Sequence, residues 1–292
     1  MTIFLRRKNS GRISGGNRRI VKLILDTLKN SFDQVINLAM QQTHLVFDTQ
    51  IGSTKPVTLR NREIQCPFCH RQLLKGVIAE DGPVMLLHNK YPVLQDAVQT
   101  VLIETYDCNS ELSTYPKEHL YKVIRFGLEK WQEMIDSGEF ASVLFYKNHG
   151  PYSGGTIWHP HMQIVGLKKI DYAQNISEES LHGDIILQEP GIELNLSNKP
   201  KIGFFEFNIL LENPAYVEKL ADYIQMVVHY ILHSFHKNCN SYNLFFYRLD
   251  GRISVKIMPR FVTSPLFVGY SIPQVSNRGA EVIREIQTLY CS

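Results

Sequence analysis

Residues 159–163, His-Pro-His-Met-Gln, combine side chains that can do chemistry at a phosphate or at a metal ion. If this stretch is a strand, a period of two places His159, His161 and Gln163 on one face. A neutral imidazole can act as a nucleophile or as a metal ligand, and an amide can donate to a phosphate oxygen. Just before it, the glycines of residues 150–155 would let backbone N–H groups approach an anion. The alternative without chemistry is a solvated strand face.

Cys66-Pro-Phe-Cys69 has the spacing of one half of a zinc site. The same spacing occurs in thiol redox motifs, which need the first cysteine at a helix N-terminus after a strand. The preceding residues 60–65, Arg-Asn-Arg-Glu-Ile-Gln, form a poor central strand. The sequence therefore favours zinc, with a redox motif or incidental cysteines as alternatives. Candidates for two further ligands are Cys108, His159, His88, His70 and His119.

Composition and charge exclude several classes of protein. Of the 292 residues, 44% are hydrophobic and 20% charged, as in globular proteins. The net charge is +3, but the first 20 residues carry six basic and no acidic side chains, so a general affinity for nucleic acid is not indicated. No apolar run reaches the roughly 18 residues of a membrane span, and no secretory segment follows Met1. Five cysteines make no disulfide framework, and we expect a cytoplasmic protein.

The pattern of apolar residues predicts two related units. Helical spacing is found over 20–40, 117–136, 215–236 and 279–290. Strand patterns are found over 84–88, 98–104, 142–147, 156–165, 204–211, 243–249 and 252–258. Val-Leu-Phe-Tyr-Lys at 143–147 and Leu-Phe-Phe-Tyr-Arg at 244–248 each follow a helix and precede a partner strand. This repetition predicts an internal duplication.

The order of these motifs resembles that of the galactose-1-phosphate uridylyltransferase family, which belongs to the histidine-triad superfamily. The chain resembles a bacterial branch of this family. The shared order is Cys-Pro-Phe-Cys, Asn-Lys-Tyr-Pro, an Ile-Glu strand, Asn-x-Gly, two glycines and His-Pro-His-x-Gln. The resemblance implies an α+β fold of two tandem histidine-triad-like units, with antiparallel strands in a half-barrel or sheet and helices packed outside. The expected domains are a basic N-terminal extension with one helix over 1–40, a first unit with the zinc site over 41–200 and a degenerate second unit over 201–292.

The resemblance also assigns roles to individual residues. His161 matches the nucleophile, which attacks the α-phosphorus of a nucleoside diphosphate compound, and Gln163 matches the residue that steadies the phosphoryl oxygens. Cys66, Cys69 and His159 match zinc ligands. Cys108 stands where the family has a histidine as the fourth ligand, and a thiolate suits tetrahedral zinc as well. The implied cofactor is a structural zinc ion.

Further positions match substrate contacts of the family. The matching residues are Asn89, Asn148, Gly154, Gly155 and Thr156. In the second half, Ser254 and Lys256 replace the His-x-His of a further metal site that many relatives carry, so we expect that site to be absent. We also expect Ser254 and Lys256 to occupy the places of His159 and His161 in the second unit.

The resemblance implies a nucleotidyltransferase or phosphorylase that acts on a nucleoside diphosphate sugar or a dinucleotide through a covalent nucleotidyl-histidine. The alternatives are a hydrolase of nucleotide conjugates, a zinc-stabilised nucleotide-binding protein without turnover, and a thiol oxidoreductase that uses Cys66 and Cys69. We expect a nucleotide or nucleotide-sugar partner, no membrane and no nucleic acid, and we keep a homodimer as a candidate assembly.

Overall fold

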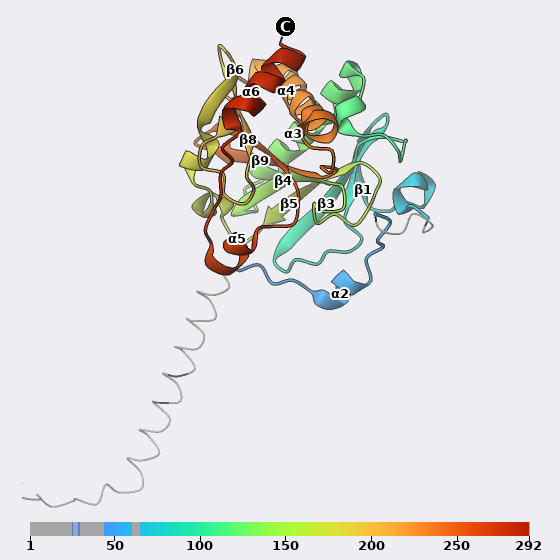
Figure 1. Ribbon diagram of the computed structural model, residues 1–292. Helices are drawn as coiled ribbons and strands as arrows, with labels where there is room; N and C mark the ends of the chain where they lie inside the picture. The colour runs from blue at the N-terminus through green and yellow to red at the C-terminus, as the bar shows by residue number, and fades with distance from the viewer. Residues whose placement is uncertain (1–24, 26–28, 30–43, 60–64, 292) are drawn as a thin grey trace, which may run out of the picture. The chain divides into compact units, whose positions relative to one another are not determined.

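The computed structural model describes residues 25, 29, 44–59 and 65–291 of the chain (Figure 1). The chain divides into two compact units, residues 1–46 and 47–292. The helix expected over 20–40 lies outside the described residues, apart from Leu25 and Lys29, which are helical. All further description concerns the second unit.

Within the described residues, ten strands form one open antiparallel sheet (Figure 1). Along the sheet the order is β1-β2-β3-β5-β4-β9-β10-β8-β7-β6. The first five strands along the chain are β1 (Val77–Asp81), β2 (Val84–His88), β3 (Ala97–Ile103), β4 (Ser142–His149) and β5 (His161–Leu167). The last five are β6 (Gly183–Glu189), β7 (Ile192–Ser197), β8 (Phe207–Leu211), β9 (Tyr242–Leu249) and β10 (Arg252–Pro259). With the helices, this sheet confirms the predicted α+β class.

The main core lies between one face of the sheet and the long helices. The α-helices are α2 (Thr49–Ser53), α3 (Lys117–Asp136), α4 (Val217–Tyr230), α5 (Pro265–Tyr270) and α6 (Gly279–Tyr290), and a π-helical turn, Ile231–Phe235, continues α4. Helices α3 and α4 cover strands of the two halves of the sheet, and α6 packs beside β6. Within the described part of the chain, no helix is both long and apolar enough to cross a membrane.

The order of elements repeats, as the duplication predicted. The first half consists of three strands, a helix and two further paired strands, in the order β1-β2-β3-α3-β4-β5. The same order recurs in the second half as β6-β7-β8-α4-β9-β10. The two halves meet where β4 pairs with β9, and there Phe145 lies opposite Phe246. Their rings stack with centroids 4.3 Å apart, and Trp131 of α3 packs against both. The matched aromatic strands of the sequence therefore form the seam between the halves.

Local sequence signals explain several boundaries. Helix α3 ends at Asp136, two residues before the expected stop signal Gly138, whose φ of +68° favours glycine. Asp250 and Gly251 both have positive φ, as a two-residue hairpin requires. The expectation of a strand over 156–165 is wrong at its start, because the chain bends at His159 and β5 begins at His161. Strands β1, β6 and β7 were not expected from the sequence.

The face of the sheet opposite the long helices, which we call the outer face, is covered by short 3₁₀ turns in each half. We call these turns the cover of that half. In the first half these are η1 (Pro67–Cys69) and η2 (Arg71–Leu73). Phe68 and Leu74 pack there on a second apolar cluster, Met85, Leu87, Val101 and Ile103. In the second half, η4 (Tyr172–Asn175) and η5 (Glu178–Leu181) precede β6 in the same way. A remaining 3₁₀ turn, η3 (Leu112–Thr114), lies just before α3, and η6 (Pro214–Tyr216) leads into α4.

Candidate functional site

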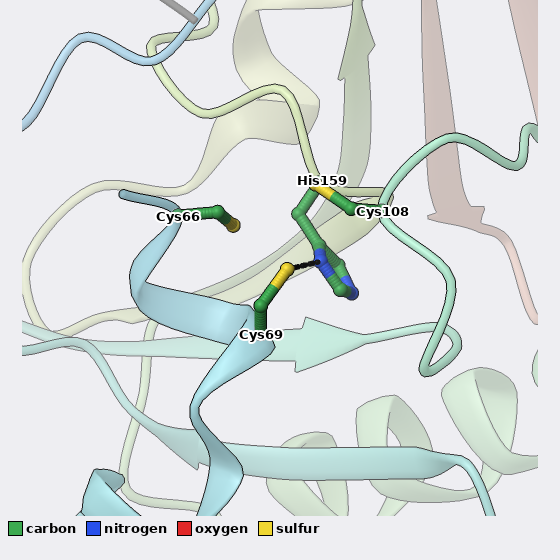
Figure 2. A group of neighbouring side chains, drawn as sticks. All are labelled: Cys66, Cys69, Cys108 and His159. Atoms are coloured by element: carbon green, nitrogen blue, oxygen red, sulfur yellow. Dashed lines mark hydrogen bonds between the residues drawn. The ribbon is translucent and has the colours of Figure 1, made fainter. Parts of the chain in front are cut away.

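Cys66, Cys69, Cys108 and His159 form one cluster, as the resemblance implied (Figure 2). One ligand atom from each residue lies within 4.8 Å of all the others. Cys66 precedes η1 and Cys69 is the last residue of η1, while Cys108 follows β3 and His159 precedes β5. Within the described residues, this is the one group of three or more His, Cys, Asp or Glu side chains close enough to hold a metal ion, and His88, His70 and His119 are not part of it.

The hydrogen bonds of His159 determine which ring nitrogen can bind a metal. Nε2 donates to the carbonyl oxygen of Thr105 at 2.9 Å, so Nδ1 of the neutral ring is left as the ligand atom. Nδ1 points at Sγ of Cys69, 3.5 Å away (Figure 2). His159 lies at a bend just before β5, and its ring contacts Phe68 with centroids 6.0 Å apart. Phe68 also contacts the ring of His161, so both histidines lie against the turn that carries Cys66 and Cys69.

The donor set fits a tetrahedral zinc ion. The 3.5 Å separation between Sγ of Cys69 and Nδ1 of His159 matches the edge of about 3.5 Å that follows from Zn–S of about 2.3 Å and Zn–N of about 2.0–2.1 Å. Burial and then the neighbouring Cys66 raise the pKa of the Cys108 thiol. Burial opposes the ionisation of Cys66, but hydrogen bonding with the side chain of His159 and with the backbone of Phe68 and Cys69 lowers the pKa of this thiol to about 7. A bound cation would stabilise the thiolate forms of these closely spaced cysteines.

His161 is the first residue of β5 and lies on the outer face, only 8% exposed. Its Nδ1 donates to the carbonyl oxygen of His159 at 2.7 Å, the backbone contact that we expected. Burial lowers the pKa of the ring to about 4, so the imidazole is neutral and Nε2 carries the free lone pair. Phe68 of the cover packs edge-on against the ring, with centroids 5.5 Å apart. This contact, which the sequence did not point to, links the cysteine cluster to His161.

Strand register places several candidate residues in rows across the outer face, because directly opposed residues share a face. Tyr146 of β4 pairs with Gln163 of β5, and the next outward-facing residues on these strands are Asn148 and His161. Asn148 in turn pairs with Asn243 of β9. One row across the outer face therefore runs through His161, Asn148 and Asn243, and the neighbouring row contains Gln163. The structure thus brings His161, Gln163 and Asn148 together at the seam between the halves.

The glycine-rich loop after β4 packs beside Asn148. A Cβ atom on Gly155 would lie 3.3 Å from Cβ of Asn148. The N–H of Gly155 already donates to Oγ of Ser153, so it is committed within the loop. Gly154 has a φ of +85°, and a Cβ atom there would meet nothing within 4 Å. Gly154 therefore borders open space.

Two further candidates have structural partners. Oδ1 of Asn89 accepts from the N–H of Tyr91 at 2.9 Å, which ties this side chain to a turn. The carbonyl oxygen of Thr156 accepts from the N–H of Leu59 at 3.0 Å. The substrate contacts assigned to Asn89 and Thr156 stay predictions.

The second half has different side chains at the matching places. Phe145 pairs with Ile164 in the first half, and Phe246 pairs with Val255 in the second half. When the two phenylalanines are taken as equivalent, Gln163 corresponds to Ser254. By the same register His161 corresponds to Arg252, not to Lys256 as we expected. The sequence comparison missed the shift because the two hairpin connections differ in length. Lys256 is buried and bonds the carbonyl oxygen of Ser180 and Oε2 of Glu206, both at 2.7 Å.

Comparison with solved structures identifies the fold. A structure described as a uridylyltransferase is 16% identical, with a TM-score of 0.62, over 77% of this chain and 91% of that chain. An ADP-glucose phosphorylase from Arabidopsis thaliana with bound ADP-glucose is 13% identical, with a TM-score of 0.63, over 78% and 90% of the two chains. The protein thus has the fold of these uridylyltransferase-like structures, which is the fold that the resemblance implied.

Sequence comparison identifies the family. The family models described as the N-terminal and C-terminal domains of DUF4931, a domain of unknown function, match residues 47–170 and 173–291. A DUF4931 family protein from Bacillus cereus ATCC 10987 is 47% identical, with a TM-score of 0.69, and the match covers 74% of this chain and all of that one. The chain belongs to the DUF4931 family. No curated protein sequence matches the chain.

Proposed function

We propose that the protein is a nucleotidyltransferase or phosphorylase that acts on a nucleoside diphosphate sugar or a dinucleotide through a nucleotidyl-His161 intermediate. The observation that carries the proposal is the state of the His161 ring. Nδ1 is held as the donor to a backbone carbonyl, and burial keeps the ring neutral. Nε2 is therefore a free nucleophile at neutral pH.

The two chemical steps balance as displacements at phosphorus. In the first, Nε2 of His161 attacks the α-phosphorus, the bond from that phosphorus to the bridging oxygen breaks, and the leaving phosphate compound departs with that oxygen. In the second, an oxygen of inorganic phosphate or of a sugar phosphate attacks, the P–N bond breaks, and Nε2 regains its lone pair. Gln163 and Asn148 lie beside His161 on the outer face, where their amides can donate to the phosphoryl oxygens.

The Cys66, Cys69, Cys108 and His159 cluster would hold a zinc ion in a structural role. Four protein ligands close the tetrahedral shell and leave no position for substrate, so the ion would supply stability and no step of the reaction. What the cluster does for the chemistry is to hold the first-half cover, and with it Phe68, against His161. We also propose that the enzyme works in the cytoplasm, where its five free cysteines would stay reduced. A homodimer and the absence of a nucleic-acid partner stay predictions.

The test is a panel of nucleotide sugars and dinucleoside polyphosphates, each incubated with and without inorganic phosphate and analysed for nucleotide products. We expect phosphate-dependent release of a nucleoside diphosphate from at least one compound, and loss of that release in His161→Asn. Zinc content and thermal stability of His161→Asn serve as the folding control. Turnover without phosphate would favour a hydrolase. Binding without any turnover would leave only the nucleotide-binding alternative, and near-normal turnover by His161→Asn would exclude the covalent route.

A further inference from the structure

Asn243 is a buried polar side chain of the second half that faces the candidate site of the first half. It lies on β9, is 3% exposed and pairs directly opposite Asn148 across the seam. Its amide nitrogen Nδ2 donates to Oδ1 of Asn148 at 2.6 Å and to the carbonyl oxygen of Ser153 at 2.9 Å. Both hydrogens of this amide therefore bind segments of the first half, which are the end of β4 and the loop that follows it.

The first of these bonds orients the amide of Asn148. Because Oδ1 accepts from Asn243, the opposite end of the amide, Nδ2 with two hydrogens, faces away from the seam. Within the described residues, Nδ2 of Asn148 takes part in no hydrogen bond. Asn148 therefore presents donors, and not an acceptor, in the row that contains His161.

The second bond orients the peptide group between Ser153 and Gly154. In a trans peptide the C=O and N–H point in opposite directions. With the carbonyl oxygen of Ser153 held by Asn243, the N–H of Gly154 is aimed away from Asn243, and Gly154 borders open space. The loop is also anchored next to Asn243, because the N–H of Tyr152 donates to Oγ of Ser241 at 3.1 Å.

We propose that Asn243 is a positioning residue that turns two sets of N–H donors, on Asn148 and on Gly154, toward the phosphate groups of the nucleotide. The ligand chemistry is that of a diphosphate, which needs donors and rejects exposed acceptors. The proposal rests on the proposed function and adds a role for a residue of the second half, which acts through Asn148 and Gly154.

The test compares the full-length variant Asn243→Leu, which removes both donors without adding charge, with wild-type protein. Calorimetric affinities are measured for ADP and UDP and for the corresponding nucleosides. We expect affinity for the better-bound diphosphate to fall at least about tenfold, the effect of one lost hydrogen bond to a charged group, and affinity for its nucleoside to stay unchanged. A structural defect alone would weaken both. Equal loss for both, or no loss for the diphosphate, overturns the proposal.

Asn195→Leu is the matched control. Asn195 is a fully buried asparagine of the second half whose Nδ2 also makes two bonds, to Leu181 and Glu193, away from the loop. We expect this variant to lose stability and to keep its diphosphate affinity. If wild-type protein binds no diphosphate, the proposed function fails, and the positioning role is then decided by side-chain amide NMR. Slow exchange of the Asn243 amide with fast exchange of the Asn148 amide supports it, and the reverse pattern overturns it.

Discussion

Each half of the sheet carries a cover of short 3₁₀ turns on its outer face, but the two covers are held by different chemistry. In the first half, Cys66 and Cys69 of the cover meet Cys108 and His159. In the second half, the carbonyl oxygen of Ser180 in the cover accepts from Lys256. A cluster of side chains that could hold a metal ion in one half thus corresponds to a lysine ammonium in the other.

The second-half contact is a dense network around one carbonyl group. The oxygen of Ser180 accepts from Nζ of Lys256 and also from Oγ of Ser197 and Nδ2 of Asn208, which come from three strands. Glu206 neutralises the ammonium and accepts from two backbone N–H groups, those of Lys201 and Ile202. A cation within the chain can therefore hold a cover against the sheet without a metal.

The two halves have different side chains at the matching position beside the cover, a histidine in the first half and an arginine in the second. Both covers are held against the sheet, and Phe68 of the first cover packs against His161, the nucleophile of the proposed function. At the matching position the second half has Arg252, which forms an exposed ion pair with Glu178. A guanidinium is not a nucleophile at any physiological pH. Under the proposed function, the metal-type cluster lies in the half that carries the attacking histidine, and the second half contributes the strand β9 that pairs with β4.

The largest expected effect comes from breaking the first-half cluster. Cys108→Ser should lose the bound zinc, since a structural site binds its ion with about 10–16 kcal/mol and couples that energy to folding. Atomic absorption should give one zinc ion per wild-type chain and less than a tenth of that in the variant, with a much lower midpoint of thermal unfolding. Cys239→Ser is the control, because Cys239 is buried outside the cluster. A wild-type protein without zinc would contradict this assignment.

Breaking the second-half contact should have the next largest effect and leave zinc in place. Lys256→Met leaves the carboxylate of Glu206 buried without its partner, and such a loss destabilises by about 3–5 kcal/mol. Lys256→Met combined with Glu206→Gln should recover part of that loss, as denaturant unfolding can measure. If Lys256→Met unfolds like wild-type protein, the ammonium does not hold the second cover.

The smallest effect concerns the seam, where His149 at the end of β4 stacks on Tyr242 of β9. Burial lowers the pKa of His149 to about 4, against the opposing charge of Glu111. The unfolded chain takes up a proton near pH 6.5 while the folded chain does not, so His149 lowers stability as pH falls from about 6.5 to about 4. His149→Phe should flatten this slope in unfolding curves measured between pH 7 and pH 4. An unchanged slope would show that His149 titrates normally.

The sequence predicted elements with strong local signals and missed those without them. Helices α3 and α6 have the predicted ends because their apolar stripes and Gly138 mark them. The edge strands β1 and β6 are largely exposed, so no alternation of apolar residues distinguishes them from loops. The four members of the metal-type cluster were identified through a family resemblance, since nothing local connects Cys66 to His159. Asn243 could not be found from the sequence, because its role depends on the register between strands of different halves.

The claim that the first half carries the chemistry is tested most directly by trapping the intermediate. Wild-type protein is incubated with the nucleotide compound that the panel identifies, without acceptor, then denatured and analysed by intact mass and peptide mapping. The account predicts a mass increase of one nucleotidyl group, which is a nucleoside monophosphate less one water, located on His161 and absent from His161→Asn. An adduct on any residue of the second half, or turnover in the panel without any adduct under rapid quenching, would contradict it.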